Sequence, residues 1–322
     1  MPVTIATPKE KWTGRVREVT LGATAAEGGT RRQKVVVGGE GTLPFLHFEA
    51  PAPHRPVIAV EVQDRYPADW SPLLLEAWGD VLESPTAWAA KAEALGADLI
   101  ALSLKSASPE GGNTGSAEAQ ATVRAVLEAV GLPLIVYGPG QAEKDNEVLV
   151  AAAEAAKGER IALGNCEDKN YRTIVAAALA HGQLVIARTP IDVNLAKQLN
   201  ILIGDMRLDP DRILMDPTTG ALGYGLEYTY SVMERLRLAA LTGDSMTQMP
   251  MICTVGEEAW RAKEAKVNTG VPAAWGDWHE RSVLWEVLTA TTLIEAGADI
   301  VVLRHPESVA HVRQAIDRLM AG

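Results

Sequence analysis

The segment RILMDPTTGALGYGLEYTYSVMERLRLAALTG, residues 212–243, contains a complete strand–turn–helix unit. The apolar run at 212–217 is short and continuous, which is typical of a strand buried on both faces in a parallel sheet. A glycine-rich turn follows it. Residues 226–243 then repeat apolar side chains at helical spacing and end in glycine, the residue favoured just past a helix. This segment predicts a strand followed by a helix, and the same pattern recurs along most of the chain.

Seven further apolar runs lie at 56–62, 97–104, 133–138, 160–165, 184–189, 251–256 and 298–304. Amphipathic segments separate them, among them 84–96, 118–131 and 170–182. Eight strand–helix units predict a (β/α)8 TIM barrel, whose usual size is about 250 residues. A doubly wound Rossmann-like sheet gives the same alternation. The count of eight and the absence of a Pro/Gly/Ser linker between two halves favour the barrel, which we expect to span 56–322.

Residues 1–55 have a different pattern. VREVTLG (16–22) and KVVVGG (34–39) are β-rich runs joined by a polar segment that contains glycine, so they predict a β-hairpin. A hairpin of this size is too small to bury a core of its own. We therefore expect an N-terminal extension whose hairpin covers the N-terminal mouth of the barrel.

The composition excludes several classes of partner. The 322 residues include 30 Lys and Arg against 41 Asp and Glu, a formal charge of −11. Nucleic-acid phosphates would be repelled by this balance, and no block of Lys and Arg offsets it, so we expect no nucleic-acid partner. The N-terminal segment lacks the apolar region of a secretory signal, and no apolar stretch reaches the roughly 18–20 residues of a membrane span. We therefore expect a cytoplasmic protein without a membrane partner.

Metal and nucleophile motifs are absent from the sequence. Cys166 and Cys253 are the two cysteines, too few for a self-contained iron–sulfur cluster, which usually needs about four thiolates. The six histidines form no HExxH pair or other close metal spacing, so the sequence predicts no metal centre held by this chain alone. No GxSxG elbow is present to anchor a hydrolase triad.

Charged residues end several of the predicted strands, where function gathers in a (β/α)8 barrel. Glu61 and Asp216 could form an acid–base pair, or Arg188 and Arg304 could neutralise them. Lys105 suits a Schiff base, although a lysine at the start of a loop is more often a solvated side chain. These residues give the mouth polar groups but no recognisable reaction machinery, so we predict no catalytic residue.

The glycine-rich turn has two interpretations. Its order, Gly-x-x-Gly-x-Gly, reverses the dinucleotide fingerprint and follows a late strand, so it is poor evidence for NAD or FAD. The glycines could serve only the positive φ of a strand-to-helix turn. Alternatively, they could let a large planar or phosphate-bearing ligand approach the backbone, with Thr218 and Thr219 facing it. Asp216 would then cap the turn or contact the ligand.

Tryptophan is concentrated around the long predicted loop at 254–280. Trp260, Trp275, Trp278 and Trp285 are four of the eight in the chain. A loop of this length in a compact domain is usually functional. We expect Trp275 and Trp278 at a partner interface, where tryptophan contributes a large buried area. Trp260 and Trp285 could instead lie on helices and pack inward.

Five segments, at 20–49, 55–64, 216–244, 249–266 and 304–320, resemble the small subunit of the corrinoid iron–sulfur protein. That family includes the delta subunit of the archaeal acetyl-CoA decarbonylase/synthase complex. The resemblance covers nearly the whole chain, hairpin included; its distinctive parts are the glycine turn and TVGEEAWRAKEA. Cys166 stands where the family leads us to expect a small residue such as alanine, and it could fill the same buried space.

The resemblance implies a heterodimer. A larger subunit carries a [4Fe–4S] cluster and a corrinoid-binding domain, and the D-x-H-x-x-G motif of many corrinoid domains is missing here. The pair carries a methyl group on cobalt in the carbon-fixing Wood–Ljungdahl pathway. A methyltetrahydrofolate-dependent corrinoid methyltransferase delivers it, and acetyl-CoA synthase/CO dehydrogenase receives it.

In this family the corrinoid (cobalamin) lies between the corrinoid domain and the C-terminal mouth of the barrel. From their predicted position at that mouth we expect the cofactor contacts to be Asp216, Thr218, Thr219, Gly220, Gly223, Thr254 and Arg304. Two alternatives remain open: a pterin-dependent methyltransferase that acts on its own, and a purely architectural subunit.

Overall fold

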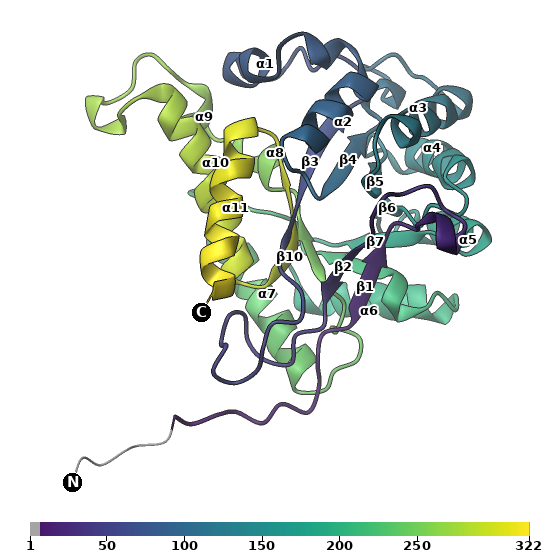
Figure 1. Ribbon diagram of the computed structural model, residues 1–322, viewed down its shortest axis with the longest axis vertical. Coiled ribbons are helices and arrows are strands. Elements are labelled where there is room, and N and C mark those ends of the chain that lie inside the picture. The colour runs from purple at the N-terminus through teal and green to yellow at the C-terminus, as the bar shows by residue number, and fades with distance from the viewer. Residues whose placement is uncertain (1–6, 322) are drawn as a thin grey trace.

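The computed structural model describes residues 7–321, which contain a closed barrel of eight parallel strands (Figure 1). The strands are β3 (Val57–Gln63), β4 (Leu99–Ser103), β5 (Leu134–Tyr137), β6 (Ala162–Cys166), β7 (Leu184–Arg188), β8 (Ile213–Asp216), β9 (Met251–Cys253) and β10 (Ala298–Leu303). They pair in chain order, and β10 closes the ring against β3. Each strand lies within one of the predicted runs or passes its end by one residue. The barrel prediction is confirmed, and the doubly wound sheet is wrong.

Helices surround the barrel between successive strands (Figure 1). The longer ones are α1 (Pro72–Trp78), α2 (Pro85–Ala94), α3 (Ser116–Ala129), α4 (Ala142–Ala155), α5 (Tyr171–His181), α6 (Val193–Asp205), α7 (Leu226–Leu241), α10 (Trp278–Glu295) and α11 (Pro306–Ala321). Local sequence sets several ends: Asp192 accepts hydrogen bonds from two backbone N–H groups at the start of α6, and Gly182 ends α5 in the left-handed conformation. Within the described residues, no helix is both long and apolar enough to cross a membrane.

The hydrophobic core has two layers. The larger one lies between strands and helices and includes Trp78 and Trp88, both almost fully buried. The smaller one fills the barrel interior with side chains such as Ala59, Leu184 and Ile300. Packed interior side chains are typical of this fold, so the barrel is not a pore, and a ligand must bind at a rim.

The N-terminal hairpin closes one end of that interior. β1 (Glu18–Leu21) and β2 (Val35–Gly38) pair antiparallel, which confirms the hairpin. Their Val19, Leu21 and Val37 belong to the interior core cluster. The cluster also contains first residues of strands, such as Val57 and Leu99. The hairpin therefore covers the N-terminal mouth and leaves the carboxyl ends of the strands open.

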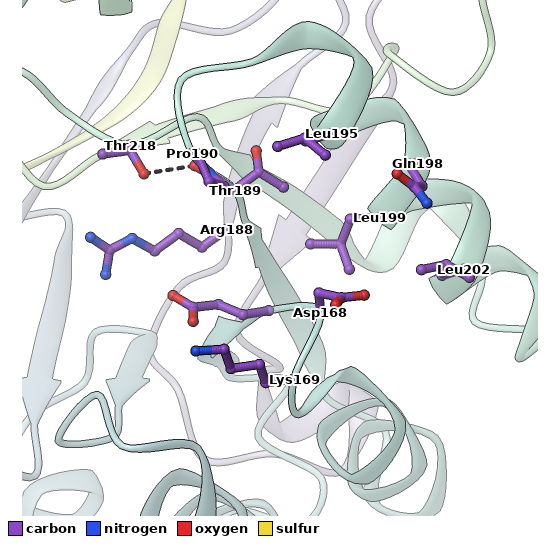
Figure 2. A pocket seen from close by; sticks show the side chains of 11 residues that line it. Asp168, Lys169, Arg188, Thr189, Pro190, Leu195, Gln198, Leu199, Leu202 and Thr218 are labelled. Atoms are coloured by element: carbon purple, nitrogen blue, oxygen red, sulfur yellow. Dashed lines mark hydrogen bonds between the residues drawn. The ribbon is translucent and has the colours of Figure 1, made fainter.

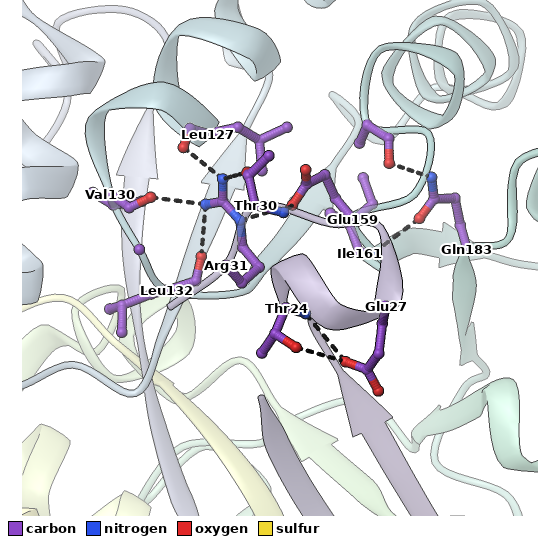
Figure 3. Close-up of polar contacts among 12 residues, drawn as sticks. Thr24, Glu27, Thr30, Arg31, Leu127, Val130, Leu132, Glu159, Ile161 and Gln183 are labelled. Atoms are coloured by element: carbon purple, nitrogen blue, oxygen red, sulfur yellow. Dashed lines mark hydrogen bonds and ion pairs between the residues drawn. The ribbon is translucent and has the colours of Figure 1, made fainter. Parts of the chain in front are cut away.

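Arg31 fastens the hairpin to the barrel. This buried guanidinium donates to the carbonyl oxygens of Leu127 (2.6 Å), Val130 (2.8 Å) and Leu132 (3.1 Å), and its Nε donates to Glu159 Oε2 at 2.8 Å (Figure 3). The Leu127 carbonyl lies in the last turn of α3, and those of Val130 and Leu132 lie in the loop that leads to β5. One side chain thus donates hydrogen bonds to carbonyls at the end of a helix and in the loop after it, and to a buried carboxylate.

The long predicted loop contains short regular elements. α8 (Val255–Ala259), α9 (Lys263–Lys266) and a 3-10 turn (Ala273–Trp275) lie within it. The segment projects beside α10 at the upper left of Figure 1. Trp260 is buried, as its inward-packing interpretation required. Trp275 and Trp278 are half-buried, and their role in a partner interface stays a prediction.

Candidate functional site

Three adjoining hollows open at the carboxyl ends of the strands. The largest has a volume of about 560 Å³, the central one about 250 Å³ and the third about 420 Å³. Arg188 lines both the largest and the central hollow. Lys105, Glu257 and Arg261 line both the central and the third. The largest and the third are in the size range of small-molecule sites, and the shared residues join all three into one polar mouth.

The largest hollow has two unlike walls (Figure 2). Leu195, Leu199 and Leu202 of α6 form an apolar wall, and Leu195 is 42% exposed. Arg188 and Lys169 are among the polar groups on the opposite side. This pairing suits a ligand with an apolar body and a polar edge.

Glu61 and Arg304 form a buried ion pair in the mouth. Arg304 Nε lies 2.6 Å from Glu61 Oε2, and Nη2 lies 3.1 Å from Oε1. The guanidinium also lies over the Trp70 ring, 4.8 Å from its centroid. Burial alone would raise the pKa of Glu61, but the Arg304 charge outweighs it and holds the pKa below its ordinary value. The neutralisation of Glu61 by a strand-end arginine is confirmed.

Asp216 has a weaker counter-charge. Its Oδ1 accepts the Thr218 N–H at 2.9 Å, whereas Oδ2 lies 3.9 Å from Arg188 Nε and accepts no hydrogen bond from any described residue. Burial raises the pKa of Asp216 to about 6, and Arg188 offsets this only in part. A buried carboxylate with a free oxygen is a candidate ligand contact.

Other polar atoms beside this carboxylate also lack partners. The Tyr137 hydroxyl and Asn165 Oδ1 belong to residues that line the central hollow, and Thr189 lines the largest. None of these buried side-chain oxygens has a hydrogen-bond partner within residues 7–321. A buried polar atom without a partner costs about 1–3 kcal/mol. The mouth is therefore suited to a ligand that brings several donors and acceptors.

The glycine turn mainly serves its own geometry. A Cβ on Gly220 would lie 2.5 Å from the Gly225 carbonyl, so two backbones meet there. Gly223 and Gly225 have φ of +74° and +96°, and the Gly220 N–H donates to Thr229 Oγ1 at 2.8 Å. Thr218 also has a positive φ, +65°, and its hydroxyl donates to the Thr189 carbonyl at 2.6 Å (Figure 2). These contacts support the structural interpretation of the turn.

The seven predicted cofactor contacts do not all lie at one hollow. Thr218, Thr254 and Arg304 line the hollows. Asp216 is buried beside Arg188, and the Thr219 hydroxyl accepts the Thr254 N–H at 2.9 Å, which ties the ends of β8 and β9 together. Gly220 and Gly223 lie in the turn and line none of these three hollows. Whether any of the seven contacts a cofactor stays a prediction.

Sequence reasoning missed several mouth residues: Tyr137, Asn165, Lys169 and Arg261. Tyr137 ends β5, and Asn165 and Lys169 lie at or just after the end of β6, so their position was a usable signal; Arg261 instead follows α8. Their side-chain types match no motif, which is why they did not stand out.

The fold and its mouth define the class of protein as a (β/α)8 barrel with a polar, hollowed rim. Solved dihydropteroate synthases share this fold. The Xanthomonas albilineans enzyme with 4-aminobenzoic acid aligns with a TM-score of 0.57 at 17% identity, over 83% of this chain and 93% of that one. The Coxiella burnetii enzyme with pteroic acid gives 0.56 at 12% identity, over 83% and 95%.

Sequence comparison is more specific. The profile of the CO dehydrogenase/acetyl-CoA synthase delta subunit matches residues 18–316. The acetyl-CoA decarbonylase/synthase complex subunit delta of Archaeoglobus fulgidus is 42% identical, with 97% of this chain and 70% of that protein aligned. The Methanopyrus kandleri subunit is 41% identical, with 96% and 76% aligned. The chain belongs to the CO dehydrogenase/acetyl-CoA synthase delta subunit family, which confirms the resemblance.

Proposed function

We propose that this chain is a subunit of an acetyl-CoA decarbonylase/synthase-type complex whose barrel mouth helps to bind and shield a corrinoid during methyl transfer. Membership of the delta subunit family supports assembly into such a complex. The observation that carries the cofactor proposal is the set of buried, unpartnered oxygens around a mouth whose main carboxylates already face arginines.

The residues of the mouth fit a corrinoid. A corrin ring is a flat apolar macrocycle edged with carboxamide arms, and each amide both donates and accepts hydrogen bonds. Asp216 Oδ2 and Asn165 Oδ1 are acceptors for amide N–H groups, and the Tyr137 hydroxyl can donate to an amide carbonyl. The leucines of α6 offer an apolar surface next to them. When bound, the corrinoid supplies a cobalt centre that accepts and releases a methyl group.

The chain's own residues would orient the macrocycle and exclude water. Leu195, Leu199 and Leu202, which line the largest hollow, would cover the apolar part of the ring, while Arg188 and Lys105 would meet its polar edge. Exclusion of water protects a reactive metal centre from side reactions. The macrocycle with its arms exceeds any one hollow, so a second chain would complete the site and would move aside when the methyl donor or acceptor approaches.

We assign the other components to partner chains. A large subunit would supply the corrinoid domain and the [4Fe–4S] cluster, because both cysteines here are buried in the core. The methyl donor would be a methyltetrahydrofolate:corrinoid methyltransferase, and the acceptor would be acetyl-CoA synthase/CO dehydrogenase.

A pterin-dependent methyltransferase is the second candidate. The free oxygens of Asp216 and Asn165 favour it, because carboxylate and amide oxygens also suit the N–H edge of a pterin. A purely architectural role would not explain why these buried oxygens lack hydrogen-bond partners.

Leu195→Asp tests the cofactor proposal, with Leu179→Asp as its matched control. Leu195 is 42% exposed at the mouth; Leu179 is 39% exposed near the end of α5, whose His181 shares a hollow with the hairpin residue Thr20. A carboxylate pressed against a ligand costs more than about 1.4 kcal/mol, so we expect roughly tenfold weaker corrinoid retention. Corrinoid per heterodimer would be read from absorbance after anaerobic co-expression with the large subunit.

Heterodimer yield, measured by gel filtration, shows whether a variant has lost only the corrinoid or has also stopped binding the large subunit. Retention that is equal in both variants and in the unmodified pair would contradict the proposal. A colourless unmodified pair would contradict it as well.

A further inference from the structure

A cluster of two histidines and one glutamate lies at the rim of the barrel, outside the hollows described above. This rim cluster consists of His279 in the first turn of α10, His305 between β10 and α11, and Glu307 in the first turn of α11. One ligand-type atom of each residue lies within 4.8 Å of the other two. His279 Nε2 is 3.1 Å from Glu307 Oε1.

We infer that the rim cluster binds a divalent transition-metal ion of the Zn²⁺ class. Two imidazole nitrogens and one carboxylate oxygen form a common three-residue zinc set, with water or another ligand in the fourth position. Bound ligand atoms of a tetrahedral zinc site lie about 3.4 Å apart, given metal–ligand distances of about 2.1 Å. The His279–Glu307 separation already agrees with this, and small side-chain rotations would bring in His305.

A second observation points to a ligand at the same place. His305 is only 1% exposed, and its Nε2 has no hydrogen-bond partner among the described residues. Its Nδ1 accepts the Glu307 N–H at a long 3.2 Å, which places the ring proton on Nε2 with nothing to receive it. Buried ring nitrogens without partners are rare in folded proteins.

Coordination through Nε2 would give this nitrogen the partner that it lacks. The ring proton moves to Nδ1, and the Glu307 N–H loses its long contact. That N–H lies in the first turn of α11 beside an exposed side chain, so water can satisfy it. The positive ends of the two helix dipoles oppose a cation, and the Glu307 carboxylate offsets them.

The surrounding contacts pre-position the histidines. The His305 ring stacks on Trp260, with centroids 5.6 Å apart, and meets His279 edge-on at 5.6 Å. The backbone N–H of His305 donates to Glu286 Oε2 at 3.1 Å. The Asp277 side chain caps the start of α10 by accepting the Glu280 N–H. Contacts of this kind hold ligand rings in one orientation and strengthen metal binding.

The inference departs from the expectation based on histidine spacing, because the fold joins residues that are distant in sequence. It is also independent of the corrinoid proposal. A bound ion would tie the start of α10 to the start of α11, next to Trp260 and Arg304 of the third hollow. It would thereby stiffen the rim where the segment 254–277 returns to the barrel.

Calorimetric titration of the untagged 322-residue chain with Zn²⁺ tests this inference. We expect one saturable site per chain, with affinity at least tenfold lower in His279→Ala and in Glu307→Gln. Both side chains are at least partly exposed, so neither change should unfold the protein. His311→Ala is the matched control, because His311 is exposed on α11 outside the cluster, and it should bind Zn²⁺ like the unmodified chain.

Co²⁺ provides a second readout. A four-coordinate site gives intense visible absorption, which we expect in the unmodified chain and in His311→Ala but not in His279→Ala. The absence of saturable Zn²⁺ binding would overturn the inference. Equal affinity in all variants, or the weak spectrum of six-coordinate Co²⁺, would also overturn it.

Discussion

At the scale of single residues, Asp216 makes stability depend on pH. Burial raises its pKa from 3.8 to about 6, so the unfolded chain loses this proton first as pH rises. Folding stability therefore falls between about pH 4 and pH 6 and then levels off. Asp216→Asn removes the titration and keeps an oxygen for the Thr218 N–H. With a difference of about two pKa units, each worth about 1.4 kcal/mol, the variant should be more stable by about 3 kcal/mol at pH 7.

Urea unfolding of both proteins at pH 4, 5, 6 and 7 measures this effect. The two free energies of unfolding should converge toward pH 4. An advantage of the variant that did not change with pH would mean that Asp216 is not the titrating group.

The sequence predicted part of the residue-level chemistry. The sequence left two interpretations of Glu61 and Asp216: an acid–base pair, or neutralisation by strand-end arginines. The arginines lie beside both carboxylates, because neighbouring strand ends in a barrel must lie close together. Which carboxylate keeps a free oxygen depends on how closely its arginine approaches: Nε lies 2.6 Å from Glu61 Oε2 but 3.9 Å from Asp216 Oδ2. The unpartnered hydroxyl of Tyr137 and the approach of His279 to His305 depend on the same fine packing. No pattern along the chain encodes it.

At the scale of elements, Arg31 decides whether the hairpin stays on the barrel. Arg31→Met would leave three carbonyls without their donor and Glu159 with only the Thr30 N–H, and loss of one partner from a buried ion pair costs about 3–5 kcal/mol. Arg32→Met is the adjacent control: the Arg32 side chain is 70% exposed, and its pair with Glu93 should be worth about 0–1 kcal/mol.

Urea unfolding gives the two stability changes. Hydrogen exchange of residues 18–38 shows whether the hairpin itself loosens. Equal losses in the two variants, or protection of the hairpin that survives Arg31→Met, would show that the apolar contacts of Val19, Leu21 and Val37 hold it without the arginine.

Elements with a strong apolar pattern were predictable. All eight barrel strands and the hairpin follow runs that are apolar or β-branched, and helices such as α2, α5 and α7 follow segments with helical spacing. The short α8 and α9 were not predicted. Helices of four or five residues are too short to show a repeat, and they form where tertiary contacts hold them.

At the scale of the whole molecule, charge is unevenly placed. The chain carries a formal charge of −11, yet Lys105, Lys169, Arg188 and Arg261 all line the hollows of the mouth. The hairpin covers the opposite end of the barrel interior. Glu61, Glu167, Asp168 and Glu257 also line the hollows of the mouth, so the mouth carries both signs and is less acidic than the chain as a whole. A mouth of mixed charge on an acidic protein suits a ligand or partner whose polar groups have both signs.

The protonation states of Glu61 and Asp216 at the mouth predict that the isolated chain transfers no methyl group. Protonation of a pterin leaving group needs a free acid that faces the ligand. Arg304 keeps Glu61 ionised, and Asp216, with a pKa of about 6, is mostly deprotonated at neutral pH. With methyltetrahydrofolate and free reduced cobalamin, the purified chain should therefore give no methylcobalamin above the blank, while a corrinoid methyltransferase gives a clear signal under the same conditions. Turnover by the lone chain that disappears in Asp216→Asn would contradict the carrier role and establish the pterin-dependent alternative.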